Sequence, residues 1–247
     1  AELFPYRHYS RGDGVNLTLP ISCVSDAGGD GSYGSPPGTM FSDIMQAVVV
    51  NNKISNVCAS GDGVADSERV CEATAAALNL EGGAGAVFPL STGVIGWRLP
   101  VDKMVEGLPA AAAALAEGTA LPAAKSIMTT DRFPKLRSVS ACGGTLIGFA
   151  KGAGMIEPDM ATMLAFVLTD VAMPREQLQP MLRRAADVSF NCASVDADQS
   201  TSDSLLCLSS RAVAAPSDEK GLAEFEAALT ELCQKLSEDV VRNGEGT

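Results

Sequence analysis

Lys151-Gly-Ala-Gly-Met-Ile-Glu-Pro-Asp-Met-Ala-Thr-Met-Leu164 is the stretch around which the rest of the sequence is organised. It runs from a glycine-containing loop through Pro158 to Thr162, where an apolar run typical of a buried strand begins. A threonine at such a junction has an ordinary explanation, because threonine is a good strand former. It can also be a nucleophile if chain cleavage frees its own amino group. That α-amine, with an ordinary pKa of about 8, can act as general base for the hydroxyl.

Composition and charge exclude several classes of protein. With 46% hydrophobic and 19% charged residues among 247, the chain has the composition of a globular protein with a sizeable core. Its net charge of −12 argues against nucleic acid or an anionic membrane as a partner, since both require basic patches. No uninterrupted apolar run is long enough to cross a membrane, and the first residues lack the layout of a signal peptide. We therefore expect a protein that is not secreted.

Segments with strand and helix character alternate along the sequence. Strands are expected at residues 21–24, 47–51, 146–150, 162–169 and 205–208, with another beginning at residue 86. Helices are expected after an N-cap at Asp66, over residues 102–116 with a kink or break at Pro109, after Pro174, and from about residue 217 to Gly244. The core face of the helix after Pro174 is expected to be Leu178, Met181, Leu182, Ala185 and Val188. The core face of the last helix is expected to be Leu222, Phe225, Leu229, Leu232, Leu236 and Val240. This alternation favours an α/β sandwich of sheet and helix layers, and residues 28–38 are expected to form a loop.

The sequence gives little sign of a metal site or of a second kind of nucleophile. Seven cysteines are scattered without a C-x-x-C spacing, which indicates reduced thiols in a reducing compartment. The run from Val195 to Asp203 begins like a calcium loop, but Thr201 and Cys207 occupy the positions where such a loop needs Gly and Glu. The single histidine, His8, has no cluster of metal ligands around it. We expect no metal.

The stretch from Lys151 to Leu164 resembles the self-cleavage and nucleophile motif of the ornithine acetyltransferase (glutamate N-acetyltransferase) family. Precursors of that family are cut between the alanine and the threonine of the motif. The resemblance therefore implies cleavage between Ala161 and Thr162, with Thr162 as the nucleophile. It extends over about residues 47–247 with several ordered signatures, and it implies that family's layered fold of sheets and helices.

Further signatures carry further roles over from the family. Ser91-Thr-Gly-Val-Ile-Gly96 has the composition of an ordinary strand-to-turn junction, but its resemblance to the family implies that Thr92 and Gly93 form an oxyanion hole. In Ile127-Met-Thr-Thr-Asp131 the resemblance implies a substrate contact by Thr129, with Thr130 as the neighbouring alternative. Lys151 and Glu245 are likewise implied to bind substrate, together with Thr162 itself.

The activity that the resemblance implies is transfer of an acetyl group from N2-acetylornithine to glutamate in arginine biosynthesis. It would proceed through an acetyl-Thr162 intermediate without a cofactor, and acetyl-CoA is a possible co-substrate. The cut would give an α-chain portion, residues 1–161, and the start of a β-chain, residues 162–247, which together form one catalytic unit. Such chains stay paired and commonly form a heterotetramer. Family members occur in bacterial cytoplasm and in the matrix of organelles (mitochondrion or plastid).

Some features depart from the family pattern and leave alternatives open. Asn52-Lys-Ile replaces the usual small residues, and residues 1–46 match the family poorly. The sequence also stops just after Asn243-Gly-Glu-Gly246, where family members continue with more strands, so we expect a truncated β-chain. One alternative is an amidase or aminopeptidase of similar fold, in which water is the acceptor. The other is a truncated or degenerate relative that folds without catalysing a reaction.

Overall fold

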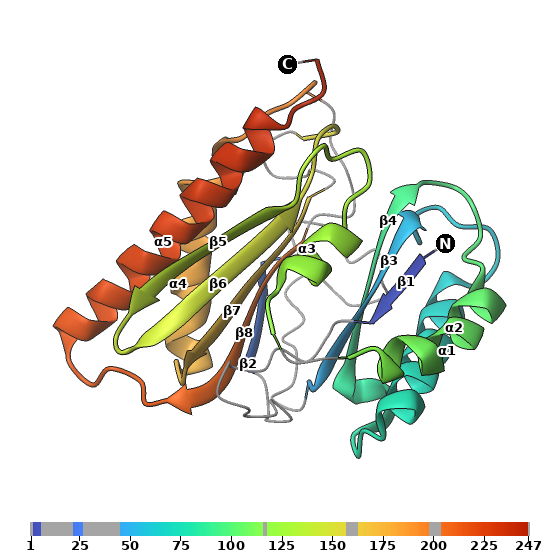
Figure 1. The fold of residues 1–247 in the computed structure, drawn as a ribbon, viewed down its shortest axis with the longest axis horizontal. Coiled ribbons are helices and arrows are strands. Elements are labelled where there is room, and N and C mark those ends of the chain that lie inside the picture. The colour runs from blue at the N-terminus through green and yellow to red at the C-terminus, as the bar shows by residue number, and fades with distance from the viewer. Residues whose placement is uncertain are drawn as a thin grey trace.

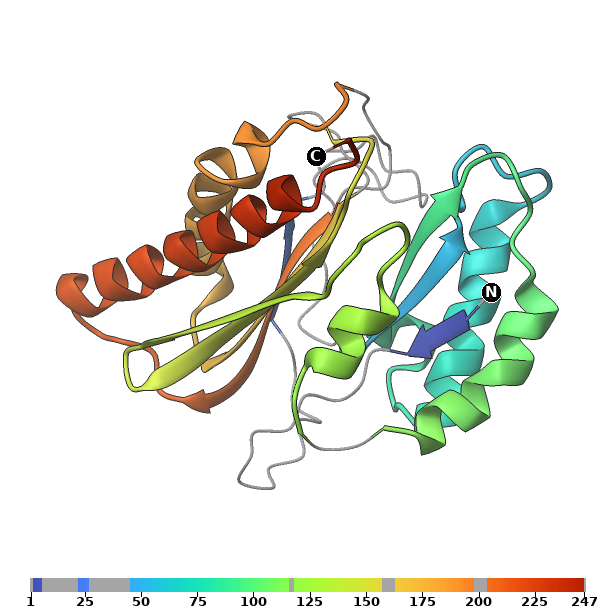
Figure 2. The same ribbon diagram turned by 45° about the horizontal axis from the view of Figure 1, so that its top comes forward.

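Two β-sheets face each other, and each carries a pair of helices on its outer side (Figures 1 and 2). The computed structural model describes residues 2–5, 22–26, 45–115, 118–156, 163–197 and 204–246. The expected loop at residues 28–38 lies outside this part of the chain, as do Ala161 and Thr162. The layers follow the order helix, sheet, sheet, helix, which confirms the predicted layered α/β sandwich.

The larger sheet has five strands in the order β2-β8-β7-β6-β5. These are β2 (Ser22–Asp26), β8 (Ser204–Val213), β7 (Leu164–Val171), β6 (Gly144–Lys151) and β5 (Lys135–Ala141). Strands β7 and β8 are parallel and the other pairs are antiparallel. Its outer face is covered by α4 (Arg175–Asp187) and α5 (Glu219–Arg242), whose apolar residues pack with Ala165 and Val167 of β7. Because β7 is covered on both faces, all of its residues are buried and its sequence is a continuous apolar run followed by Thr169 and Asp170.

The smaller sheet has the strand order β1-β3-β4. It consists of β1 (Glu2–Pro5), β3 (Ala47–Ile54) and β4 (Val87–Val94), with β3 and β4 parallel. The connection between β3 and β4 contains α1 (Gly63–Leu78) and the short η1 (Gly83–Ala86), and α2 (Val101–Ala113) packs beside α1 on the same outer face. One hydrophobic cluster lies under each pair of outer helices, and a third lies between the two sheets. The third cluster includes residues of α3 (Leu121–Ser126). Within that cluster the rings of Phe149 and Phe166 stack with centroids 4.9 Å apart.

Most predicted elements are present, with corrections at their ends. Helix α1 begins at an N-cap on Asp62, whose carboxylate accepts a hydrogen bond from the Ala65 N–H at 3.0 Å. The prediction of Asp66 as N-cap was therefore wrong, since Asp66 is buried inside the first turn and pairs with Arg98. Pro109 does not break α2. Four of the five expected core residues of α4 are buried, but Val188 at its end is 51% exposed.

The buried face of helix α5 is close to the predicted one. Five of its six expected core residues, all except Leu222, are buried against the larger sheet, and Asp218 is its N-cap. In the described part of the chain, no helix combines the length and the apolar character needed to cross a membrane.

Candidate functional site

Two of the predicted site residues meet between the sheets. Lys151 is the last residue of β6, and Thr92 lies near the end of β4 in the other sheet. The ammonium Nζ of Lys151 donates a hydrogen bond to Oγ1 of Thr92 at 2.8 Å. Both residues are almost completely buried, with exposed fractions of 1% and 0%. A buried ammonium requires polar partners, and the hydroxyl of Thr92 is one of them.

Gly93 follows Thr92 in a conformation that favours glycine. Its φ angle is +122°, and it pairs with Lys53 in the parallel register of β3 and β4. A Cβ atom at this position would lie 2.3 Å from the carbonyl carbon and oxygen of Lys53, so no side chain fits without moving the backbone. The close approach of the Lys53 backbone therefore requires glycine at the position that follows Thr92.

Asn52 connects this strand end to the segment that leads to Thr129. It pairs with Thr92 in the β3–β4 register, and its Nδ2 donates to the carbonyl oxygens of Ser126 at 2.6 Å and Met128 at 3.0 Å. The structure therefore places Thr129, which is exposed, directly after a residue that is tied to β3. The side chains of Asn52 and Lys53 are part of the departure from the family pattern seen in the sequence.

A buried carboxylate that the sequence analysis did not single out lies between these segments. Oδ2 of Asp131 accepts the Thr129 N–H at 3.0 Å, and its Oδ1 accepts the Gly152 N–H at 2.8 Å. Lys135 Nζ also donates to Oδ1. Burial alone raises the pKa of the Asp131 carboxyl, but the hydrogen bonds from Gly152, Lys135 and Thr129 outweigh it and hold that pKa below its usual value. The only signal in the sequence is the spacing of Asp131 and Lys135, which is too common to identify such a pair.

Glu245 is positioned by hydrogen bonds from the C-terminal segment to the segments that contain Asp131 and Gly152. Its backbone N–H donates to the carbonyl of Ala153 at 2.6 Å, and Asn243 Oδ1 accepts the Arg132 N–H at 2.9 Å. The carboxylate of Glu245 also approaches Gly154, where a Cβ atom would lie 2.9 Å from Oε2. The C-terminal segment therefore contacts Ala153 and Gly154, which follow Lys151 by two and three positions.

The proposed cleavage point, Ala161 and Thr162, lies outside the described residues, but the residues on each side of residues 157–162 are placed. A Cβ atom at Gly152 would lie 3.2 Å from Cδ1 of Ile156 and 3.9 Å from Cβ of Met163. Ile156 pairs with Val195, and the Met163 carbonyl accepts the Ser204 N–H at 3.0 Å. Both flanking residues therefore lie beside Gly152, the neighbour of Lys151.

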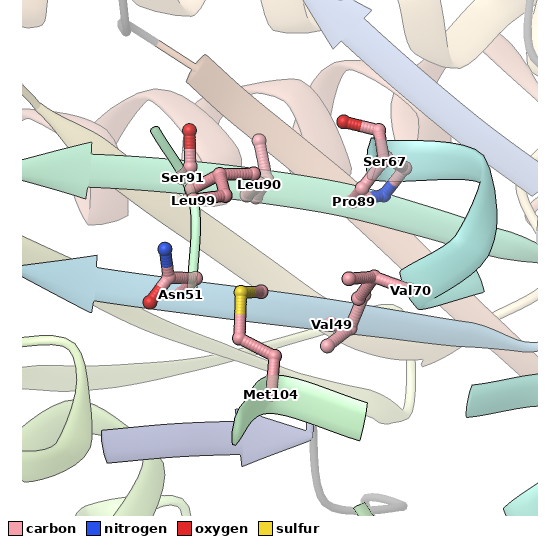
Figure 3. A pocket seen from close by; sticks show the side chains of 9 residues that line it. All are labelled: Val49, Asn51, Ser67, Val70, Pro89, Leu90, Ser91, Leu99 and Met104. Carbon is pink, nitrogen blue, oxygen red and sulfur yellow. The ribbon is translucent and has the colours of Figure 1, made fainter. Parts of the chain in front are cut away.

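Other potential sites are less suitable for chemistry on a small molecule. A cavity of about 10 Å³ lies on the helix side of β3 and β4, where Asn51, Ser67 and Ser91 are among its lining residues (Figure 3). It could hold about one water molecule, so an amino acid does not fit. Burial raises the pKa of Cys233 to about 12, and burial together with Glu68 and Glu72 does the same for Cys71, so neither thiol is a ready nucleophile. In the described ranges, no three His, Cys, Asp or Glu side chains gather as metal ligands.

The sequence was compared with protein families and with known proteins. The sequence profile of the ArgJ family matches residues 38–247. The arginine biosynthesis bifunctional protein ArgJ of Methylococcus capsulatus is 44% identical over 206 residues, covering 81% of this chain and 50% of that protein. The ArgJ protein of Geobacter sulfurreducens is 40% identical over 212 residues, covering 83% and 53%. The chain spans about half the length of these curated relatives.

Solved structures show a more distant similarity. Ornithine acetyltransferase from Mycobacterium tuberculosis, determined in complex with ornithine, is 25% identical with a TM-score of 0.39, covering 64% of this chain and 98% of that one. An L-aminopeptidase D-Ala-esterase/amidase from Ochrobactrum anthropi is 12% identical with a TM-score of 0.42, covering 81% of this chain and 67% of that one.

Proposed function

The chain belongs to the ArgJ family, and we propose that it acts in arginine biosynthesis by moving an acetyl group from N2-acetylornithine to glutamate. The observation that carries this proposal is the hydrogen bond between Lys151 and Thr92. It brings together, from two different sheets, one residue assigned to substrate binding and one assigned to the oxyanion hole. The names of the curated relatives, which are bifunctional proteins of arginine biosynthesis, support the same assignment.

The first step of the proposed mechanism generates the nucleophile. The hydroxyl of Thr162 attacks the carbonyl carbon of Ala161, the peptide C–N bond breaks, and the acyl group moves from nitrogen to oxygen. Water then hydrolyses the resulting ester. The products are a carboxylate on Ala161 and a new N-terminal Thr162 whose free amine can accept a proton.

The second step transfers the acetyl group. The Thr162 hydroxyl attacks the acetyl carbonyl of N-acetylornithine while its own amine takes the proton, and that proton leaves with the amine of ornithine. Attack by the amine of glutamate on the acetyl-threonine ester then releases N-acetylglutamate. Thr92 O–H and Gly93 N–H stabilise the oxyanion in both halves. Because Lys151 donates to Oγ1 of Thr92, the hydroxyl proton of Thr92 remains available for that oxyanion.

Three segments supply the groups that hold the substrate in this scheme. Thr129 lies on the exposed segment after α3, Lys151 at the end of β6, and Glu245 on the C-terminal segment. In this scheme the ammonium of Lys151, which binds Thr92, is also the charge partner of a substrate carboxylate. The exposed carboxylate of Glu245 would pair with the side-chain amine of ornithine.

The remaining features of the assignment are also proposals. The reaction uses no cofactor, and acetyl-CoA is an alternative acetyl donor. The two cleavage products stay together as one catalytic unit and form a heterotetramer in the cytoplasm or in an organelle matrix. An amidase or aminopeptidase would use water in place of glutamate, so acetyl transfer to glutamate distinguishes the two activities.

The experiment that tests the proposal is an intact-mass measurement of the purified chain beside Thr162→Ala. Thr230→Ala, on the partly exposed side of α5, is the matched control. We expect two fragments that meet between residues 161 and 162 in the parent and in the control, and one unbroken chain in Thr162→Ala. An uncut parent, or cleavage that persists in Thr162→Ala, would contradict the proposal.

A further inference from the structure

Asp131 binds two separate segments of the candidate site at once. Its Oδ2 accepts the N–H of Thr129 at 3.0 Å, and its Oδ1 accepts the N–H of Gly152 at 2.8 Å. Lys135 pairs with the same Oδ1, and the side chains of Asp131 and Lys135 are both fully buried. The carboxylate therefore connects the Thr129 segment to the residue that follows Lys151.

The residue after Asp131 also connects this segment to the C-terminal segment that contains Glu245. The N–H of Arg132, next to Asp131, donates to Asn243 Oδ1 at 2.9 Å. Two residues after Asn243, the N–H of Glu245 donates a hydrogen bond to the carbonyl oxygen of Ala153 at 2.6 Å. These hydrogen bonds form a closed ring through residues 129–132, 151–153 and 243–245. Apart from Thr162 and the two oxyanion-hole residues on β4, every residue proposed to contact the substrate belongs to one of these three segments.

A carboxylate is the side chain that this junction requires. An ionised carboxylate accepts hydrogen bonds through both oxygens, whereas an amide accepts through one and donates through the other group. Asparagine at position 131 could therefore accept from Thr129 or from Gly152 but not from both. The buried ammonium of Lys135 compensates the negative charge of this carboxylate.

We propose that Asp131 is a positioning residue that fixes the Thr129, Lys151 and Glu245 segments relative to one another and so sets the geometry for self-cleavage and for substrate binding. The effect of Asp131 on self-cleavage and on substrate binding rests on the proposed function. The connection that Asp131 makes between the segments does not depend on that function.

Two variants and one control separate these effects. Asp131→Asn should release one of the two bound N–H groups. The double variant Asp131→Ala/Lys135→Met should release both, and it leaves no uncompensated buried ammonium. The control is Asp170→Asn. Asp170 is also buried and accepts a backbone N–H, that of Thr145, but it lies at the opposite end of β6, about 20 Å away by strand geometry.

The first measurement is amide hydrogen exchange in the uncut Thr162→Ala background. We expect exchange at Thr129 and Gly152 to increase about tenfold in the double variant and at only one of the two in Asp131→Asn, because each released N–H loses one hydrogen bond. Strand β7 and helix α5 should exchange as in the parent, and Asp170→Asn should leave both amides protected. No change at either amide, or an equal increase in β7, would overturn the inference.

The second measurement is the cleavage rate and, in cut protein, the kinetics of acetyl transfer. We expect slower cleavage in both Asp131 variants, and in Asp131→Asn a KM for N-acetylornithine that rises more than kcat falls. Asp170→Asn should behave like the parent. Cleavage at the parent's rate together with an unchanged KM would overturn the inference. A parent that is not cut would contradict the proposed function, and the exchange result would then decide the role of Asp131 alone.

Discussion

At the scale of the residue, the ammonium of Lys151 and the hydroxyl of Thr92 are buried partners 2.8 Å apart. If this bond orients the hydroxyl toward an oxyanion, Lys151→Met should lower the rate of acetyl transfer by about 100-fold, which is the usual effect of losing one oxyanion donor. The measurement is kcat with N-acetylornithine and glutamate. Lys103→Met, on the exposed side of α2, is the control and should keep the parent's rate. An unchanged kcat in Lys151→Met would contradict this role.

Lys53 has a backbone conformation that lysine rarely adopts. Its φ angle is +126°, and its backbone lies against Gly93. Relief of this strain should outweigh the additional freedom of glycine in the unfolded chain, so Lys53→Gly should raise the free energy of unfolding by about 1 kcal/mol. Urea denaturation measures the difference. Asn79→Gly is the control, because asparagine tolerates the left-handed conformation that Asn79 has at the end of α1. A less stable Lys53→Gly would contradict the account of strain.

The ion pair of Asp131 and Lys135 should make stability depend on pH in a defined direction. The pKa of Asp131 is lower in the folded protein than its ordinary value of about 4, so the pair's contribution is complete above about pH 4 and is lost as the pH falls through the folded pKa. At neutral pH, Asp131→Asn should be less stable by about 3 kcal/mol, because it leaves Lys135 buried without its charge partner. Unfolding free energies measured across the acid range should show this gap narrowing only below about pH 4. A gap that stays constant in acid would contradict the assignment.

At the scale of the element, α5 shows what a sequence can predict. Its expected core residues recur at helical spacing, and the observed helix of 24 residues buries all of them except Leu222. Asp218 accepts the Gly221 N–H at 2.8 Å, so Asp218→Ala should lower the free energy of unfolding by about 1 kcal/mol. Thermal unfolding measures this change. Asp218→Asn, which keeps an acceptor, should remain near the parent, and equal losses in both variants would contradict the role as a cap.

The elements that the sequence analysis missed lack such a pattern. Strand β5 is at the edge of its sheet and mostly polar, and Arg137 on it pairs with Asp239 of α5 at 2.7 Å. Helix α3 has only six residues, too few to show a period, and β1 has four. Asp66 and Asp62 are both reasonable caps by residue type, and the sequence alone does not distinguish Asp62, which caps the helix, from Asp66, which pairs with Arg98.

At the scale of the whole molecule, the site depends on the two sheets facing each other. Thr92 and Lys151 are 59 positions apart and lie on different sheets, so no spacing rule predicts that they touch. The family resemblance predicted both residues, but it did not predict their contact or the role of Asp131. The two sheets are joined by the apolar layer between them, in which Val50 and Leu90 of the smaller sheet belong to the same hydrophobic cluster as Phe166 of the larger sheet.

Acetylation of Thr162 can be measured as the mass of each fragment after the cut protein is incubated with N-acetylornithine in the absence of glutamate. We expect the fragment beginning at Thr162 to gain the mass of one acetyl group and to lose it when glutamate is added. N-acetylglutamate should appear in the same step. No acetyl group on that fragment, or an acetyl group on a residue other than Thr162, would contradict the account.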